Sequence, residues 1–468
     1  MAKGAALNMH RADLSDTIAA ISTPVGEGGI GIVRLSGKDS LKIADKIFFS
    51  SSGKRPSSFR TFTLHYGLIK DGKNVLDEVI LSVMRSPKSY TKEDIVEINC
   101  HGGIVALRDI LALVLKAGAR LADPGEFTKR AFLNGRIDLT QAEAVIDIIR
   151  AKTDSALKVG VDQLKGAVSM QVNKIREVLL SVLSGLEANI DFPEENLGPG
   201  GFKTVFKELE QVNLRLKAII ESSKFGQILR EGVHVVICGK PNTGKSSLLN
   251  TLLKKERSIV TAIAGTTRDT VEEIIDIKGV PVRIVDTAGI LRPRNIIEKK
   301  AVMRSKKHID IAQIILMIFD GSKRLSQEDK AIISKLNKKE VIAVVNKIDL
   351  KQKIERAQIL KVFDKVVDIS AKKGKNIDIL EKAIIDLIYS GRVLGQEAGV
   401  VVNLRQMKLI EKAQNLIAKA LKSLDNKLPV DLLAQDIKDA LNYLDDVLGK
   451  RFSEDLLDKI FNEFCIGK

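Results

Sequence analysis

A glycine-rich segment near the middle of the chain has the residue types and spacing that bind phosphate. GKPNTGKSS, residues 239–247, fits G-x-x-x-x-G-K-S, with Gly239, Gly244, Lys245 and Ser246 at the defining positions. Glycines let backbone N–H groups wrap a phosphate, the lysine reaches its outer oxygens, and the serine hydroxyl binds Mg²⁺. The strand-like HVVIC precedes this phosphate loop and the helix-like SSLLNTLL follows it. Because a chance turn would not need these flanks, we predict a site for a nucleoside triphosphate with Mg²⁺.

A second motif indicates which base is bound. NKID places Asn346, Lys347 and Asp349 directly after the strand-like VIAVV. An aspartate carboxylate accepts hydrogen bonds from both the ring N–H and the exocyclic amine of guanine, and adenine offers no such donor pair. The later segment DISAKKG has the form of the last base-binding loop of GTPases. The bound nucleotide is therefore predicted to be GTP.

A third motif, DTAG, begins at Asp286 after the strand-like VRIVD and is expected near Mg²⁺ and the γ-phosphate. The three motifs, in this order, resemble those of the translation-factor-like branch of P-loop GTPases. The predicted GTP contacts are Asn242, Thr243, Gly244, Lys245, Ser246, Ser247, Thr261, Ala262, Ile263, Ala264, Gly265, Thr266, Thr267, Asp286, Thr287, Ala288, Gly289, Asn346, Lys347, Asp349, Ser370, Ala371 and Lys372.

Two departures from small GTPases shape the expected mechanism. Ile290 follows DTAG where many small GTPases carry the glutamine that orients the attacking water, and only Arg268 is left open as an arginine finger in cis. A monovalent cation held by hard oxygen ligands would neutralise the developing charge instead. We predict magnesium ligands at Ser246 and Thr267, and potassium ligands at Asn242, Thr261, Ile263 and Thr266. The alternative for Asn242 is that its side chain only ties the loop together.

The elements that position these motifs make the chain an α/β plus all-α multidomain protein. Short strand-like runs mix with helical stretches over residues 1–135, and long Leu- and Val-rich helical stripes occupy 136–228. Strands and helices alternate over 229–392, the expected Ras-like P-loop GTPase domain, and 393–468 is helical again. The two helical segments would each expose an apolar face unless they paired, so the GTPase domain is predicted to be inserted into one helical bundle domain.

Composition limits the compartment and the partners. At 468 residues the chain is expected to form about three domains. The three cysteines, Cys100, Cys238 and Cys465, are far apart and odd in number, which predicts a reducing cytoplasm and no disulfide framework. No signal peptide or apolar run long enough to span a membrane is evident, so no stable membrane insertion is expected. The net charge of +16 favours polyanionic partners, although a solvated lysine-rich surface gives the same count.

Three local patterns have competing interpretations. GEGGIG, with Gly26, Gly28 and Gly31, matches a dinucleotide fingerprint, but strand-like IVRLSG follows it, so a hairpin turn is predicted. Adjacent Cys100 and His101 point to opposite faces of a strand, which argues against a Cys–His pair. The terminal CIGK is a poor C-a-a-X lipidation signal, because glycine and lysine fill its last two places.

The whole chain resembles the MnmE (TrmE) family of bacterial and organellar tRNA modification GTPases. The resemblance rests on GTTRD, DTAG, DTIAAISTPVGEGGIGIVRLSG, CHGG, FLNGRIDLTQAEA and the terminal CIGK. It implies a homodimer whose GTPase domains associate in a GTP- and potassium-dependent cycle. It also implies an FAD-dependent MnmG (GidA-like) partner and the installation of a 5-carboxymethylaminomethyl-type group on the wobble uridine of certain tRNAs.

The resemblance also assigns site residues. It implies that the N-terminal domain is a folate-binding-like and dimerisation domain that holds a 5-formyl- or methylene-tetrahydrofolate as one-carbon donor, at Arg34, Glu97, Arg136 and Lys468. It places Cys465 near that pocket as a catalytic residue, with simple packing of the tail as the alternative. It places Glu298, a carboxylate in the segment after DTAG, as the group that orients the water, with a helix-terminal acid as the alternative.

Two other functions compete with tRNA modification. A ribosome-assembly GTPase of the nearest type appends an RNA-binding KH module, whereas the C-terminal segment here is Leu-periodic helix. A bare signalling switch would not need the N-terminal domain. The sequence leaves open which tRNAs are substrates, whether ammonium or glycine supplies the nitrogen, what Cys465 does chemically, and how the GTP and folate sites are coupled.

Overall fold

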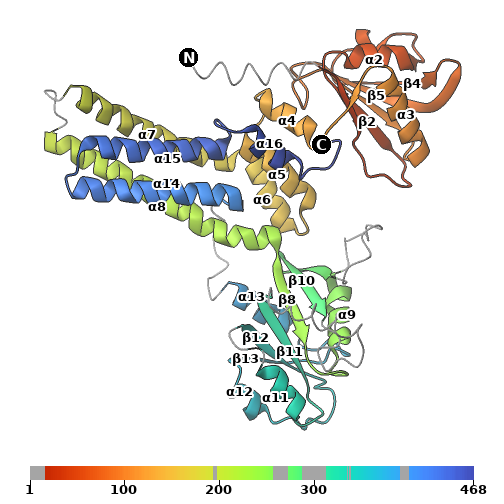
Figure 1. The fold of residues 1–468 in the computed structure, drawn as a ribbon. Helices are drawn as coiled ribbons and strands as arrows, with labels where there is room; N and C mark the ends of the chain where they lie inside the picture. The colour runs from red at the N-terminus through yellow and green to blue at the C-terminus, as the bar shows by residue number, and fades with distance from the viewer. Residues whose placement is uncertain are drawn as a thin grey trace. The chain divides into compact units, whose positions relative to one another are not determined.

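The computed structural model describes residues 16–192, 198–256, 272–286, 312–334, 336, 339–389 and 400–468. The chain divides into two compact units (Figure 1). The first draws on residues up to Ile146, on Gln163–Asn213 and on Leu409–Lys468, and the second consists of Asp147–Asp162 and Leu214–Lys408. The four-segment division expected from the sequence, with bounds at 135, 228 and 392, stays a prediction.

The first unit contains a seven-stranded sheet in the order β3-β4-β5-β6-β2-β1-β7. Its strands are β1 (Ile18–Ile21), β2 (Gly31–Ser36), β3 (Phe48–Ser50), β4 (Thr63–Asp71), β5 (Asn74–Met84), β6 (Ile95–Cys100) and β7 (Arg120–Leu121). Helices α2 (Ser40–Ile47) and α3 (Ile104–Lys116) cover one face, where alternate residues such as Val33, Leu35 and Cys100 are buried. β1 and β2 are antiparallel and joined by residues 22–30, so the hairpin predicted at GEGGIG is confirmed.

The helices of this unit come from both ends of the chain. They are α4 (Glu126–Leu133), α5 (Leu139–Arg150), α7 (Ala167–Asp191), α15 (Val430–Leu448), α16 (Glu454–Phe461) and parts of α6 (Asp154–Leu164), α8 (Gly198–Glu231) and α14 (Leu404–Asp425). The stripe predicted on α7, including Ile175, Leu179 and Leu186, is buried. Arg176 on α7 pairs with Asp445 on α15 at 2.6 Å. The predicted pairing of helices from before and after the GTPase segment is therefore confirmed (Figure 1).

The second unit contains a six-stranded sheet in the order β13-β12-β11-β8-β10-β9. Its strands are β8 (Val233–Cys238), β9 (Glu272–Ile277), β10 (Val280–Asp286), β11 (Ile314–Asp320), β12 (Glu340–Asn346) and β13 (Lys365–Asp368). Only the β9–β10 pair is antiparallel; the other neighbours run parallel, and their strands are nearly all apolar because helices cover both faces.

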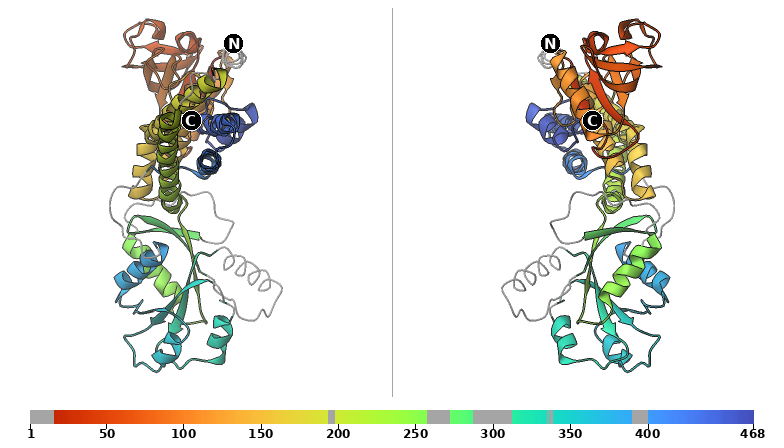
Figure 2. Two further views of the ribbon diagram at one scale, coloured as in Figure 1. Left: turned by 90° about the vertical axis from the view of Figure 1, so that its left-hand side faces the viewer. Right: turned by 90° about the vertical axis from the view of Figure 1, so that its right-hand side faces the viewer.

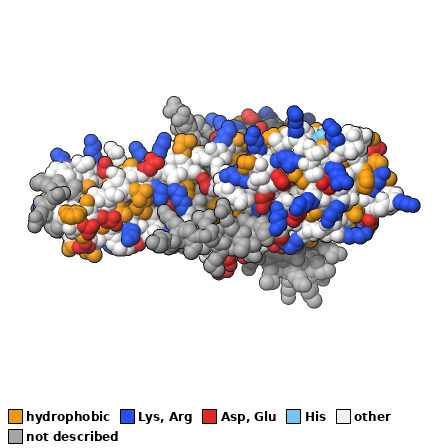
Figure 3. All heavy atoms as spheres, turned by 90° about the horizontal axis from the view of Figure 1, so that it is seen from above, with side chains coloured by type: hydrophobic (Ala, Val, Ile, Leu, Met, Phe, Trp, Pro, Cys, Tyr) orange, Lys and Arg blue, Asp and Glu red, His pale blue; other side chains and the backbone are white. Residues whose placement is uncertain are grey.

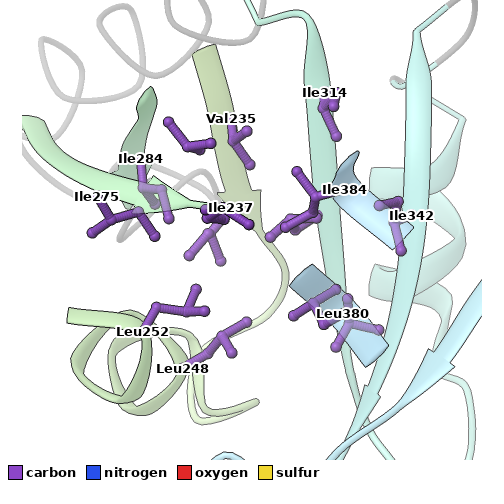
Figure 4. Close-up of a cluster of buried hydrophobic side chains, with 14 of the residues drawn as sticks. Val235, Ile237, Leu248, Leu252, Ile275, Ile284, Ile314, Ile342, Leu380 and Ile384 are labelled. Carbon is purple, nitrogen blue, oxygen red and sulfur yellow. The ribbon is translucent and has the colours of Figure 1, made fainter. Parts of the chain in front are cut away.

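Helices lie on both faces of this sheet (Figure 2), and a buried apolar core fills the space on each side. Leu248 and Leu252 of α9 (Lys245–Glu256) and Leu380 and Ile384 of α13 (Ile377–Ile388) pack on one face, as Figure 4 shows. Helices α11 (Gln327–Ile333) and α12 (Arg356–Leu360) pack on the other, where Cys238 is buried. Because β10, β8, β11, β12 and β13 run parallel, their carboxyl ends lie at one edge of the sheet. The predicted nucleotide motifs lie at that edge. Among the described helices, none is both long and apolar enough to span a membrane.

Candidate functional site

The phosphate loop connects the end of β8 to the start of α9. Gly239 and Gly244 have φ values of +146° and +97°, which residues that carry a side chain rarely adopt. A Cβ at Gly244 would lie 2.2 Å from Nδ2 of Asn346, and one at Gly239 would lie 2.5 Å from the carbonyl oxygen of Ile318. Both glycines of the motif are therefore required by the backbone conformation and by close packing.

Hydrogen bonds from its own side chains close the loop on itself. The ammonium of Lys245 donates to the carbonyl oxygens of Gly239 at 3.0 Å and Lys240 at 2.8 Å. The hydroxyl of Thr243 donates to the same Lys240 carbonyl at 2.9 Å. Lys245 is 8% exposed, so its charge is held inside the curve of the loop, where a P-loop lysine reaches phosphate oxygens.

Asn346 joins the phosphate loop to the predicted base-binding loops. Its Nδ2 donates to the Thr243 carbonyl at 2.9 Å, and its Oδ1 accepts from the backbone N–H groups of Lys347 at 2.8 Å and Ala371 at 3.0 Å. Ser370 donates to Oδ1 of Asp349 at 2.6 Å. That hydrogen bond lowers the pKa of Asp349, which keeps the carboxylate ionised as the acceptor that guanine recognition needs.

Sequence reasoning missed one charged residue of this site. Asp320 ends β11, and its Oδ2 lies 2.7 Å from the ammonium of Lys347, which also donates to the Asn242 carbonyl at 2.8 Å. Burial alone would raise the pKa of Asp320, but hydrogen bonds from Lys347 and Ser322 outweigh it and hold that pKa below its usual value. An acid at the end of the buried run IILMIFD was the available signal, because parallel strands end at the edge that carries the site.

Several predicted GTP and metal contacts lie outside the described residues. These are Thr261, Ala262, Ile263, Ala264, Gly265, Thr266, Thr267, Thr287, Ala288, Gly289 and Glu298. Asp286 ends β10. Ser246 and Ser247 stand in the first turn of α9, and Lys372 is exposed in the loop after Ser370.

A second cluster of predicted residues lies in the first unit. Nε of Arg34 pairs with Oε1 of Glu97 at 2.7 Å, across the β2–β6 register that places the two residues opposite each other. Nη1 of Arg34 also donates to the carbonyl oxygen of Gly467 at 3.3 Å, although the two residues are 433 positions apart. The guanidinium of Arg34 lies 5.6 Å from the ring centre of Phe127.

Tyr90 connects Arg136 to the same cluster. The guanidinium of Arg136 lies 4.7 Å from the centre of the Tyr90 ring, a cation–π contact. Burial raises the pKa of Tyr90, while Thr128, Arg136 and Arg34 act in the opposite direction, so both arginines act on this ring. The fold thus brings the guanidinium groups of Arg34 and Arg136, the carboxylate of Glu97 and the rings of Tyr90 and Phe127 close to one another. Tyr90 and Phe127 were not singled out from the sequence.

The tail that carries Cys465 is held by its backbone. Gly467 has a φ of +94°, and a Cβ there would lie 2.2 Å from the carbonyl oxygen of Ile21. The Cys465 carbonyl accepts from the N–H of Gly125 at 3.4 Å and of Lys468 at 3.3 Å, and the Cys465 side chain is exposed. Cys100 and Cys238 are buried, and burial raises their pKa values to about 11 and about 12.

His101 is exposed on the surface of the first unit. Its Nδ1 lies 2.7 Å from Oδ1 of Asp77, and the hydrogen bond that the imidazole donates to this carboxylate raises the pKa of His101. Cys100 points into the core instead, so the prediction that the two neighbours face opposite ways is confirmed.

The parallel sheet, the phosphate loop and the guanine-type loops define a P-loop GTPase. A model of the MnmE helical domain matches residues 139–465, and a model of the GTP-binding protein TrmE N-terminus matches residues 17–136. The chain is also similar to proteins named tRNA modification GTPase MnmE. The relative from Clostridioides difficile (strain 630) is 46% identical over 457 residues, which is 97% of this chain and 100% of that protein. The relative from Carboxydothermus hydrogenoformans is 45% identical over 461 residues, with coverage of 97% and 100%. The chain therefore belongs to the MnmE family.

Proposed function

We propose that this protein hydrolyses GTP to drive the installation of a 5-carboxymethylaminomethyl-type group on the wobble uridine of certain tRNAs, together with an FAD-dependent MnmG-like partner. The observation that carries the proposal is similarity over 97% of the chain to relatives named tRNA modification GTPases, combined with the GTPase site. The cytoplasm, which holds tRNA and keeps thiols reduced, is the proposed compartment.

The test is mass spectrometry of tRNA nucleosides from a strain that lacks the gene. We expect the modified uridine to disappear, to return with the wild-type gene, and not to return with a Lys245→Ala gene, because the phosphate-binding ammonium is then missing. A strain that keeps the modified uridine but accumulates immature ribosomal subunits would replace this proposal with the ribosome-assembly function.

The proposed one-carbon donor is a 5-formyl- or methylene-tetrahydrofolate at Arg34, Glu97, Arg136 and Lys468. The donor set suits such a molecule, since guanidinium groups bind glutamyl carboxylates and a carboxylate accepts from a pterin edge. When bound, the folate would supply the carbon that is transferred, while these residues bind and orient it. Equilibrium dialysis with 5-formyltetrahydrofolate tests this: Glu97→Gln should weaken binding, and the exposed Lys38→Ala in the same domain should not.

The proposed charge-neutralising cation is potassium beside Asn242, with Glu298 orienting the water and with Ser246 and Thr267 as magnesium ligands. Asn242 has a φ of +64°, and among the described residues its backbone carbonyl, not its side chain, joins the loop to Lys347. This arrangement leaves the amide oxygen for a cation. GTP hydrolysis should be faster in KCl than in NaCl at equal ionic strength, and Asn242→Ala should remove that difference. Equal rates for the wild-type protein would refute the potassium proposal.

A further inference from the structure

The second residue of the phosphate loop has a side-chain partner outside the loop. Nζ of Lys240 lies 2.7 Å from Oδ2 of Asp329 and 2.8 Å from the hydroxyl of Ser326. Ser326 is the N-cap of α11, and Asp329 completes a capping box with it. The loop is thus joined from the outside to the first turn of a helix that takes no part in the predicted nucleotide contacts.

This ion pair is largely removed from water. The side chain of Asp329 is 4% exposed and that of Lys240 is 17% exposed. Oδ2 of Asp329 forms the ion pair with Lys240 and accepts hydrogen bonds from Ser326 N at 2.9 Å and from the Ser326 hydroxyl at 3.0 Å. Oδ1 is buried and has no hydrogen-bond partner among the described residues. Removing the ammonium would leave a buried carboxylate without its counter-charge, so the position of Lys240 is strongly restricted.

Fixing the Lys240 side chain also fixes its backbone carbonyl. That carbonyl accepts from the ammonium of Lys245 and from the hydroxyl of Thr243. The position of the phosphate-binding ammonium therefore depends on a residue whose own side chain is anchored to α11.

A second ion pair supports the loop from the same connection. Asp320 is the last residue of β11, directly before the connection to α11. It forms an ion pair with Lys347, which donates to the Asn242 carbonyl. The segment from Asp320 to Asp329 thus contributes two buried carboxylates, and each acts on the phosphate loop through one lysine. The two contacts reach the loop at residues 240 and 242, on either side of Pro241.

We propose that Lys240 is a positioning residue for phosphate binding: through its ion pair with Asp329 it pre-organises the phosphate loop and the ammonium of Lys245. The loop then binds nucleotide without first ordering itself, which increases affinity because less conformational entropy is lost on binding. The helix α11 therefore contributes to nucleotide binding, although it contains none of the predicted GTP contacts.

The experiment measures the Kd of the full-length protein for a fluorescent GDP analogue. Lys240→Met and Asp329→Asn should each weaken binding about tenfold, the effect expected for losing one contact to a buried charged group in the site. The double variant should bind about as weakly as either single variant, because residues that act as a pair are not additive. Lys240→Arg, which keeps the positive charge, should bind the GDP analogue with most of the wild-type affinity.

The matched control is Lys330→Met, which removes an exposed lysine next to Asp329. It should bind the GDP analogue like the wild type. A fall in melting temperature with unchanged Kd in Lys240→Met, or additive losses in the double variant, would overturn the proposal and leave the ion pair with a purely structural role. If Lys240→Met does not fold, Lys240→Gln replaces it in the same comparison, and wild-type affinity in that variant also overturns the proposal.

Discussion

At the scale of single residues, the C-terminal CIGK tail is anchored by its backbone, and the thiol of Cys465 takes no part in that anchoring. Its backbone is fixed through Gly467 and through the Cys465 carbonyl, whereas the thiol itself is exposed and lies outside the buried apolar core around Phe461 and Phe464. A change confined to the thiol should therefore leave the fold and the GTP site intact.

We accordingly expect Cys465→Ser to keep the melting temperature and the GTP hydrolysis rate of the wild type while eliminating the modified uridine. The reason is that the tail belongs to the first unit and the phosphate loop to the second. Calorimetry, a hydrolysis assay and tRNA nucleoside mass spectrometry measure the three quantities. Normal amounts of modified uridine in the variant strain would show that the tail is only packing.

Asp320 gives a prediction about pH. Its folded pKa lies below the usual value of 3.8, so its ion pair contributes stability that is present above that value and is lost as the pH falls through the folded pKa. Asp320→Asn should lower the melting temperature at pH 7, and the gap to the wild type should narrow below about pH 4. A gap that stays constant from pH 7 to pH 3 would contradict this account. The exposed neighbour Lys323→Gln is the control.

Residue types and spacing predicted the parts of the GTP site that lie within one motif. Asn346, Asp349 and Ser370 come together as expected because Asn346 ends β12, Asp349 follows that strand, and Ser370 follows β13. The contacts Lys240–Asp329 and Arg34–Gly467 could not be predicted from motifs, because their partners are far apart in the sequence and belong to different motifs or to none. Only the folded chain brings such distant positions within hydrogen-bond distance.

At the scale of elements, alternation of apolar and polar residues predicted the strands of the N-terminal sheet. No sequence pattern indicated which compact unit residues 147–162 belong to. This stretch clusters with the unit that carries the phosphate loop, and the expected domain bounds stay a prediction. Asp147 pairs with Arg230 at 2.7 Å, and Gly279 approaches Ser155 so closely that a Cβ would lie 2.5 Å from its hydroxyl. Helical periodicity reports which face of a helix is buried, but not which neighbour buries it.

The face of the N-terminal sheet opposite α2 and α3 exposes apolar side chains. Leu64 is 70% exposed, Tyr66 54% and Ile80 45%, and the register of β4 and β5 places Tyr66 directly opposite Ile80. An apolar strip of this kind is typical of an interface between subunits, and it is a candidate interface for the homodimer that the family resemblance implies.

If the homodimer that the family resemblance implies forms through this face, Leu64→Asp combined with Ile80→Asp should give a monomer, because two carboxylates would lose their hydration in the apolar interface. Sedimentation velocity measures the change. Lys73→Asp, in the exposed turn of the same hairpin, should leave the dimer intact. An unchanged sedimentation coefficient in the double variant would exclude this face as the interface.

At the scale of the whole molecule, charge is the property that bears on tRNA. The chain carries 75 Lys and Arg against 59 Asp and Glu. Figure 3 shows basic side chains spread over the visible face with acidic ones between them, and not gathered in one patch. With no tryptophan and 4% aromatic residues, the protein has few rings for stacking on bases, so contacts to tRNA should be mainly to phosphates.

Binding that depends on phosphate contacts releases counterions, so its strength must fall as salt rises. We expect the Kd for tRNA to increase by at least about tenfold between roughly 50 and 200 mM salt, with log Kd linear in log salt concentration. Fluorescence anisotropy with labelled tRNA measures this. The titration uses NaCl with GDP present, so that the proposed effect of potassium on the GTPase domain does not enter the measurement. A Kd that does not change with salt would show that tRNA is recognised through bases or apolar contacts, and that the excess of lysine only solvates the surface.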